Sequence, residues 1–186
     1  MRRAILLFLA SLLAPATEAG ATDYYFGADL SYVNEMEDCG AVYREKGEKR
    51  DPYAILKDHG GNLVRIRIWN NPDWTKYSNL ADVKRSIARA KALGLQTLLD
   101  FHYSDDWADG DKQIMPKAWE KIKDDKALAQ ALYQFTYDTL AELDREKLMP
   151  EMVQVGNETN PELLGGKKDK PINWTRNALL LNAGIK

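Results

Sequence analysis

A carboxylate and an amide stand directly after a short apolar run near the carboxyl end of the chain. Residues 152–160 read MVQVGNETN, so the apolar run stops at Gly156 and is followed by Asn157 and Glu158. Such a run is typical of a buried strand, and barrel enzymes carry catalytic groups at the carboxyl ends of parallel strands. We therefore predict that Glu158 is a general acid/base. The alternative, from these residues alone, is that Glu158 caps the loop that follows.

Polar side chains also end three earlier apolar stretches. Each has an ordinary structural explanation: Asp29 could cap a turn, Arg65 could pair with a structural carboxylate, and His102 could be a hydrogen-bonded core residue. If the strands are parallel, their carboxyl ends converge, and these groups would form a pocket that combines acid, base and cation. We predict an active site there. Its candidate residues are Asp29, Arg65, Arg67, Trp69, Asp100, His102, Asn157 and Glu158.

Four strands must hold these residues, and a helix follows each strand. In the second strand, branched apolar residues alternate with two arginines and a tryptophan, which places the polar residues on one face. The helices begin at capping Asp or Asn residues, and three of them are followed by glycine. The predicted strands are 24–30, 62–69, 95–102 and 152–160, the predicted helices are 51–60, 80–93, 126–145 and 174–183, and 31–50 and 103–123 are predicted to be long loops.

The alternation of strands and helices predicts an α/β fold with a parallel sheet covered by helices. Polar residues on one face near the carboxyl ends favour a (β/α)8 TIM barrel over a doubly wound sheet, whose strands are apolar on both faces. The first strand is not followed by a glycine-rich dinucleotide fingerprint. A closed barrel needs eight units and roughly 250 residues. With four units in 186 residues, we expect half of a barrel from a truncated sequence, or alternatively a natural half-barrel.

The first residues have the composition of an export signal. Arg2 and Arg3 precede an apolar stretch over 4–14, and Ala19-Gly20-Ala21 resembles a cleavage site. We expect a signal peptide over 1–21, cleaved near Ala21, and a secreted or periplasmic protein whose residues 22–186 form half of a catalytic domain. The apolar stretch is too short to span a bilayer, so no membrane association is expected.

The remaining composition argues against several classes of partner and cofactor. The net charge is −2 and basic residues are interleaved with acidic ones, so no nucleic-acid partner is expected. The chain has two histidines and one cysteine, and the acidic segment 105–111 lacks the ligand pattern of an EF-hand. A nucleophile-elbow motif is also missing. We therefore expect neither a metal nor a cofactor.

Four segments together resemble glycoside hydrolase family 53, the endo-β-1,4-galactanases of a clan of retaining (β/α)8 glycosidases. The resemblance covers nearly all of the chain after the export signal, and the third segment is its most specific part. An Asn-Glu pair alone would be weak, because it is shared across the clan. The segments are 26–31, 64–72, 100–109 and 155–158, which read FGADLS, VRIRIWNNP, DFHYSDDWAD and VGNE.

The resemblance implies a role for each candidate residue. Glu158 is the acid/base, and Asn157 holds the 2-hydroxyl of the reacting sugar. Arg65 lies near the nucleophile and helps to keep it ionised. The family's nucleophile is a second Glu on the seventh strand, and the matching position lies beyond this sequence. The substrate-binding residues implied in this way, or by their place on the strands, are Asp29, Arg65, Trp69, Asp100, His102, Trp107 and Asn157.

The resemblance implies a retaining endo-β-1,4-galactanase that hydrolyses the β-1,4-galactan of type I arabinogalactan, and a monomer when full length. Because retaining hydrolysis needs two carboxyl groups, we expect this chain to be inactive by itself and its full-length parent to be active. Two alternatives stay open. One is a galactan-binding protein without catalysis, and the other is a different retaining glycanase of the clan, such as a cellulase or a mannanase.

Overall fold

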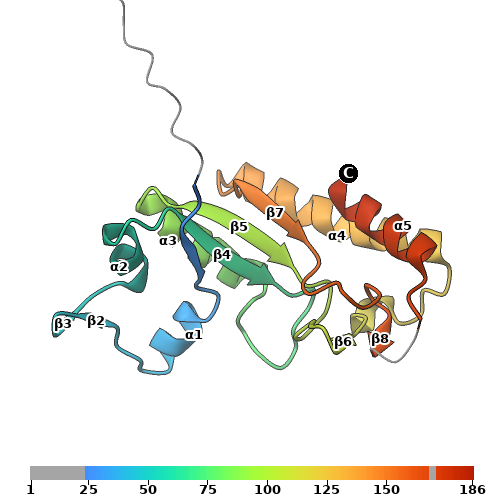
Figure 1. Ribbon diagram of the computed structural model, residues 1–186, viewed down its shortest axis with the longest axis horizontal. Helices are drawn as coiled ribbons and strands as arrows, with labels where there is room; N and C mark the ends of the chain where they lie inside the picture. Colours follow the sequence, from blue (N-terminus) through green and yellow to red (C-terminus); the bar gives the residue numbers. More distant parts are fainter. Residues whose placement is uncertain (1–23, 168–170) are drawn as a thin grey trace, which may run out of the picture.

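A computed structural model of the chain describes residues 24–167 and 171–186. The predicted export signal over 1–21 lies outside the described residues. The described chain forms a four-stranded parallel sheet in the order β1-β4-β5-β7, flanked by helices (Figure 1). These strands are Gly27–Asp29 (β1), Leu63–Ile68 (β4), Gln96–Phe101 (β5) and Met152–Val155 (β7).

The longer helices start where the sequence places capping residues. The side chains of Asp51, Asn79, Asp124 and Asn173 each accept a hydrogen bond from a backbone N–H in the first turn of the helix that follows. The predicted helices and parallel strands are thus confirmed, with ends shifted by a few residues. The helices are Pro52–Asp58 (α2), Leu80–Ala92 (α3), Asp125–Arg145 (α4) and Trp174–Ile185 (α5), with a short 3-10 helix Lys117–Trp119 (η1).

The segment 31–50, predicted to be a loop, contains regular structure. It forms the helix Val33–Asp38 (α1) and a hairpin of Arg44–Glu45 (β2) and Glu48–Lys49 (β3). The helix is too short to show a hydrophobic period, and no side chain caps its first turn. The hairpin turns at Lys46 and Gly47, both with positive φ, and a lysine at the first of these positions lacks the usual Asn-Gly signal.

Another pair of short strands joins two loops that the sequence leaves unconnected. Lys112–Gln113 (β6), in the loop before α4, pairs antiparallel with Gly166–Lys167 (β8), in the loop after β7. Two-residue strands carry no readable alternation. Their pairing nevertheless fixes the loop that follows β5 against the loop that follows β7 (Figure 1).

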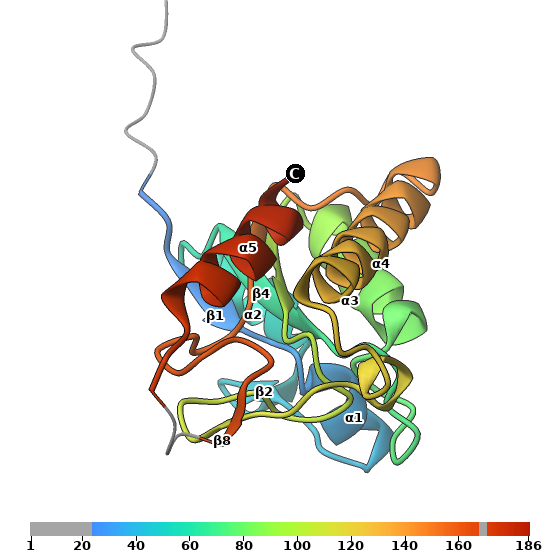
Figure 2. The same ribbon diagram turned by 90° about the vertical axis from the view of Figure 1, so that its right-hand side faces the viewer.

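The hydrophobic core lies between the sheet and the helices on one of its faces. The helices α3, α4 and α5 lie along that face (Figure 2): α3 contacts β4 and β5, and α5 packs on α4 and β7. The core therefore uses the apolar positions that alternate along the strands, while the polar positions between them face the other side. Core residues include Val64, Ile66, Ile68, Val83, Ile87, Leu99, Phe101, Leu132 and Leu143.

The sheet is open at β1 and at β7 within the part of the chain that the structure describes. An apolar groove of about 530 Å³ runs beside β7 and between α4 and α5, and its lining includes Tyr137, Leu140, Met149, Val153 and Ile185. A parallel sheet with helices on one face and polar residues on the other has the form of part of a TIM barrel. None of the described helices has the length and apolar character needed to cross a membrane.

Candidate active site

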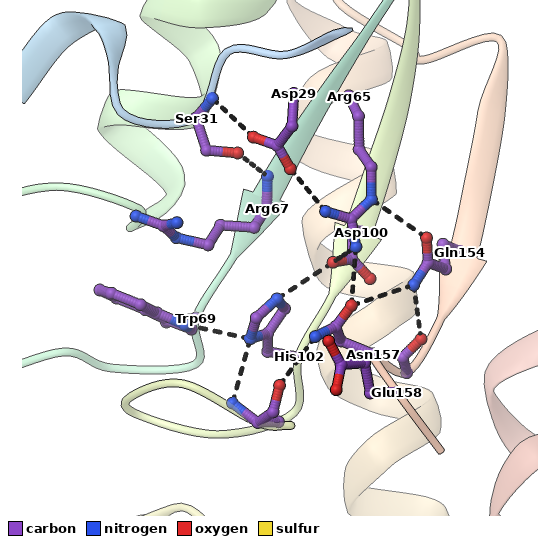
Figure 3. A network of polar contacts seen from close by, with 12 residues as sticks. Asp29, Ser31, Arg65, Arg67, Trp69, Asp100, His102, Gln154, Asn157 and Glu158 are labelled. Atoms are coloured by element: carbon purple, nitrogen blue, oxygen red, sulfur yellow. Dashed lines mark hydrogen bonds and ion pairs between the residues drawn. The ribbon is translucent and has the colours of Figure 1, made fainter. Parts of the chain in front are cut away.

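The guanidinium of Arg65, on β4, contacts residues at three other strands or strand ends, those of β1, β5 and β7 (Figure 3). Its Nη1 donates to Asp29 Oδ2 at 2.5 Å, and its Nη2 donates to Asp100 Oδ2 at 2.5 Å and to Asn157 Oδ1 at 2.7 Å. Its Nε donates to Gln154 Oε1 at 3.2 Å. An arginine inside a barrel requires such partners, because a partly buried charge without them would be costly. The structure thus brings the predicted Asp29, Arg65, Asp100 and Asn157 together.

Asp100 is the buried anion of this cluster, with 0% of its surface exposed. Its Oδ2 accepts the bond from Arg65 and also lies 3.0 Å from His102 Nε2, off the line of a well-directed hydrogen bond. Its Oδ1 has no hydrogen-bond partner among the described residues. Since Asp100 and His102 are both fully buried, they can act on a substrate only through the residues that they hold in place.

His102 also has a fixed environment on its other ring nitrogen. Nδ1 accepts hydrogen bonds from Trp69 Nε1 at 3.3 Å and from the backbone N–H of Ala108 at 3.2 Å. A nitrogen that accepts two such bonds carries no proton of its own. In the neutral ring, the proton therefore lies on Nε2, toward Asp100.

We expect NMR to find this tautomer. In a sample with 15N-labelled histidine, long-range ¹H–¹⁵N correlations of the neutral His102 ring should show a protonated Nε2 and an unprotonated Nδ1. His59 is exposed on the surface and serves as the internal reference. A proton on Nδ1 of neutral His102 would contradict the arrangement, because it would face two hydrogen-bond donors.

Arg67 lies on the same face of β4 as Arg65 but in a different environment. Its Cζ lies 4.0, 4.6 and 4.4 Å from the ring centroids of Tyr32, Trp69 and Trp107. Its Nε donates to Ser78 Oγ at 2.9 Å. Burial lowers the pKa of Arg67 from its usual range. Three aromatic rings thus stabilise this buried cation. Arg67 packs against the rings that line the site, whereas Arg65 binds carboxylates.

The three tryptophans near the site differ in exposure. Trp69 is 1% exposed and donates to His102, so its ring supports the site and cannot stack on a sugar in this arrangement. Trp107 is partly exposed. Trp74, which is not among the predicted site residues, is 58% exposed, and its ring centroid lies 5.2 Å from that of Trp69. Trp74 could have been predicted from the sequence, because it follows the second predicted strand closely and lies near Trp69 in the chain.

Glu158 lies in the loop beyond β7, beside Asn157 (Figure 3). The chain turns at Gly156, with φ of 85°, and Glu158 itself has φ of 45°. The strand ends at Val155, so the prediction of a strand over 152–160 is wrong beyond that residue. It is Asn157 that contacts Arg65, and Glu158 is exposed, with Oε2 accepting a bond from Gly110 N at 2.8 Å.

The acidic loop 105–111 makes hydrogen bonds to the backbone. Asp105 accepts from the N–H groups of Asn71 at 2.9 Å and Lys117 at 2.8 Å, and Asp109 Oδ1 accepts from Lys112 N at 2.9 Å. These carboxylates therefore fix turns. Within residues 24–167 and 171–186, no group of three or more His, Cys, Asp or Glu side chains is placed to hold a metal ion.

Comparison with known families finds one match over almost the whole described chain. The model of glycosyl hydrolase family 53 matches residues 25–186. The arabinogalactan endo-β-1,4-galactanase of Cellvibrio japonicus is 54% identical over 192 residues, which cover 100% of this chain and 51% of that protein. The endo-β-1,4-galactanase of Bacillus subtilis is 37% identical over 183 residues, which cover 94% of this chain and 41% of that protein.

Solved structures show the same relationship. A structure from a study of two fungal β-1,4-galactanases superposes with a TM-score of 0.79 at 37% identity, covering 86% of this chain and 47% of that one. The GH53 catalytic domain of Ignisphaera aggregans superposes with a TM-score of 0.79 at 36% identity, covering 90% of this chain and 48% of that one. The chain spans about half the length of the relatives that it matches.

Proposed function

Because the chain belongs to glycosyl hydrolase family 53, we propose that it carries the acid/base side of a retaining endo-β-1,4-galactanase. Its substrate is the β-1,4-galactan of type I arabinogalactan, in accordance with the names of the Cellvibrio japonicus and Bacillus subtilis relatives. The observation that carries the proposal is an exposed carboxylate, Glu158, adjoining a polar cluster built on Arg65.

Glu158 is the proton donor in this proposal. In the first step it protonates the oxygen that leaves the anomeric carbon, and in the second step it takes a proton from the attacking water. In a retaining enzyme a second carboxylate, about 5–5.5 Å away, forms the bond to the anomeric carbon, and we assign that role to none of the described residues. The bond from Gly110 N to Oε2 leaves Oε1 free to face the leaving group.

Asn157 is the residue that holds the reacting sugar. Its Oδ1 accepts from Arg65, and its Nδ2 donates to the carbonyl of Ala108 at 2.8 Å. A side-chain amide has two N–H bonds, so one hydrogen of Nδ2 remains for the 2-hydroxyl of the sugar. The amide is thus oriented before the substrate binds, which is the condition for strengthening this bond in the transition state.

Asp29 and Arg65 face the same space. Asp29 Oδ1 accepts from the backbone N–H of Ser31 at 2.9 Å, and Oδ2 accepts from Arg65. The side chains of both are partly exposed, at 40% and 29%. Asp29 can therefore accept a hydrogen bond from a sugar hydroxyl, and the remaining N–H of Arg65 Nη1 can donate to a sugar hydroxyl or to another carboxylate. The positive charge of Arg65 would favour the ionised form of a nearby nucleophile. Exposed rings such as Trp74 and Trp107 can stack on the sugar chain.

A chimera tests this function. In it, this chain replaces the part of the Cellvibrio japonicus galactanase that it matches, so that the remainder of the barrel is supplied. We expect the chimera to release reducing ends from galactan and not from mannan or cellulose, and the isolated chain to release none. A chimera that binds galactan without cleaving it, while the unmodified relative cleaves it, would favour the non-catalytic alternative. Cleavage of mannan or cellulose in place of galactan would favour another glycanase.

Export is part of the proposal, on the basis of the sequence over 1–21 alone. When the chimera is expressed with its own first residues in a bacterial host, the mature protein should be found in the periplasm or the medium, with a new amino terminus near Thr22. Protein that stays in the cytoplasm with Met1 intact would contradict this.

A further inference from the structure

The loop between β5 and α4 holds both sides of the peptide backbone at Glu158. The contact is made by Gln113, the last residue of β6, which is 2% exposed. Its Nε2 donates to the carbonyl oxygens of Asn157 at 2.9 Å, Asp109 at 3.1 Å and Glu158 at 3.4 Å. With two hydrogens for three acceptors, the bonds to Asn157 and Asp109 are the principal ones.

Two of these carbonyl groups belong to the peptide units on either side of the Glu158 Cα. The carbonyl of Asn157 lies in the preceding peptide unit and that of Glu158 in the following one. The amide therefore fixes the peptide unit before Glu158 by its bond to the Asn157 carbonyl and makes a longer contact with the unit after it, which together limit the direction of the Glu158 side chain. This restraint matters because Glu158 has φ of 45°, a left-handed conformation that non-glycine residues adopt only where their surroundings require it.

The same loop also contacts the carboxylate itself. Gly110 N donates to Glu158 Oε2 at 2.8 Å. A Cβ added to Gly110 would lie 3.0 Å from Asn160 Nδ2 and 3.3 Å from Glu158 Oε2, so a side chain at this position would push against the carboxylate of Glu158. The pairing of β6 with β8 anchors Gln113. The loop thus fixes the backbone of Glu158 at one point and its carboxylate at another.

We infer that Gln113 is a positioning residue for proton transfer by Glu158, an inference that rests on the proposed function. Gln113 does not face the sugar, because its side chain is buried against three carbonyl groups. The side chain of Asn157 is held by Arg65 and by the carbonyl of Ala108, not by Gln113. Loss of Gln113 would therefore leave the sugar-binding groups in place and allow Glu158 to leave its left-handed conformation. The expected defect is therefore in the protonation of the leaving group and not in substrate binding.

The experiment compares two substrates in the chimera. Galactan has a poor leaving group that needs a proton, whereas a dinitrophenyl β-1,4-galactotrioside has a leaving group that does not. The Gln113→Met variant keeps the length of the side chain and removes its donors. We expect its kcat on galactan to fall by about 10²-fold, the effect of a displacement of about 1 Å, with KM nearly unchanged. The rate of glycosyl-enzyme formation from the aryl substrate should fall by less than a tenth of that factor.

The Gln130→Met variant, at an exposed position of α4, is the matched control and should retain the rates of the chimera on both substrates. If Gln113→Met does not fold, Gln113→Asn carries the same test, because the shorter amide keeps its polarity and does not span the gap to Asn157. Equal losses on both substrates, or no loss on galactan, would overturn the inference. If Glu158→Gln also leaves galactan cleavage intact, the proposed function itself fails, so the two failures are distinguishable.

Discussion

Replacing Glu158 with Gln in the chimera should lower turnover on galactan by about 10²–10⁴-fold, the usual contribution of a general acid/base. The substituted amide keeps the size of the side chain and can still contact Gly110, but it cannot donate a proton to the leaving oxygen. The affinity for galactan should change little, because the groups that hold the sugar are separate from Glu158. Reducing-end assays and isothermal titration with galactan measure the two effects.

The matched control is Glu48→Gln, in the exposed strand β3 of the hairpin far along the chain from the site. Its activity should equal that of the chimera. If Glu158→Gln retained more than a third of the turnover, Glu158 would not be the proton donor, and the interpretation of this residue as a loop cap would be favoured.

The second large effect is expected at Arg65. Its replacement by Met removes the partner of Asp100, a carboxylate with 0% exposure. Leaving such a buried charge without its partner costs about 3–5 kcal/mol. We expect a loss of this size in the free energy of unfolding, measured by urea denaturation with tryptophan fluorescence. Activity should also fall to background, because Asn157 loses the contact that orients its amide.

Two further variants separate the effect of the charge of Arg65 from the effect of its hydrogen bonds. Arg85→Met breaks an exposed ion pair with Asp38 and should cost less than about 1 kcal/mol. Arg65→Lys keeps the charge but cannot bind Asp29, Asp100 and Asn157 at once, so it should recover part of the stability and little of the activity. Equal unfolding free energies for Arg65→Met and Arg85→Met would contradict a central role for Arg65.

The parallel strands and the longer helices could be predicted from the sequence because their signals are local. Alternating residues along 63–68 separate the core face from the polar face, and capping residues mark the starts of helices. The cluster of Asp29, Arg65 and Asp100 follows from the same alternation, since parallel strands bring their carboxyl ends to one side.

Other features depend on contacts between loops, which have no periodic signal. The predicted strand 152–160 continues past Gly156, where the chain in fact turns. The prediction therefore placed Glu158 on the strand, whereas it lies in the turn that follows. Likewise, alternation places Trp69 on the polar face but does not show that Arg67 and His102 bury it. Gln113 contacts residues 44 and 45 positions later in the chain, and only the fold brings them together.

Chemical rescue tests the assignment of Glu158 most directly. In the Glu158→Ala chimera, azide can occupy the space of the lost side chain and attack the glycosyl-enzyme without a general base. With the dinitrophenyl galactotrioside as substrate, we predict that azide raises the rate of turnover and that the product is the β-glycosyl azide, which retains the configuration of the substrate. An α-glycosyl azide would instead identify Glu158 as the nucleophile. The absence of any rescue in a folded variant that still binds galactan would contradict its role as the acid/base.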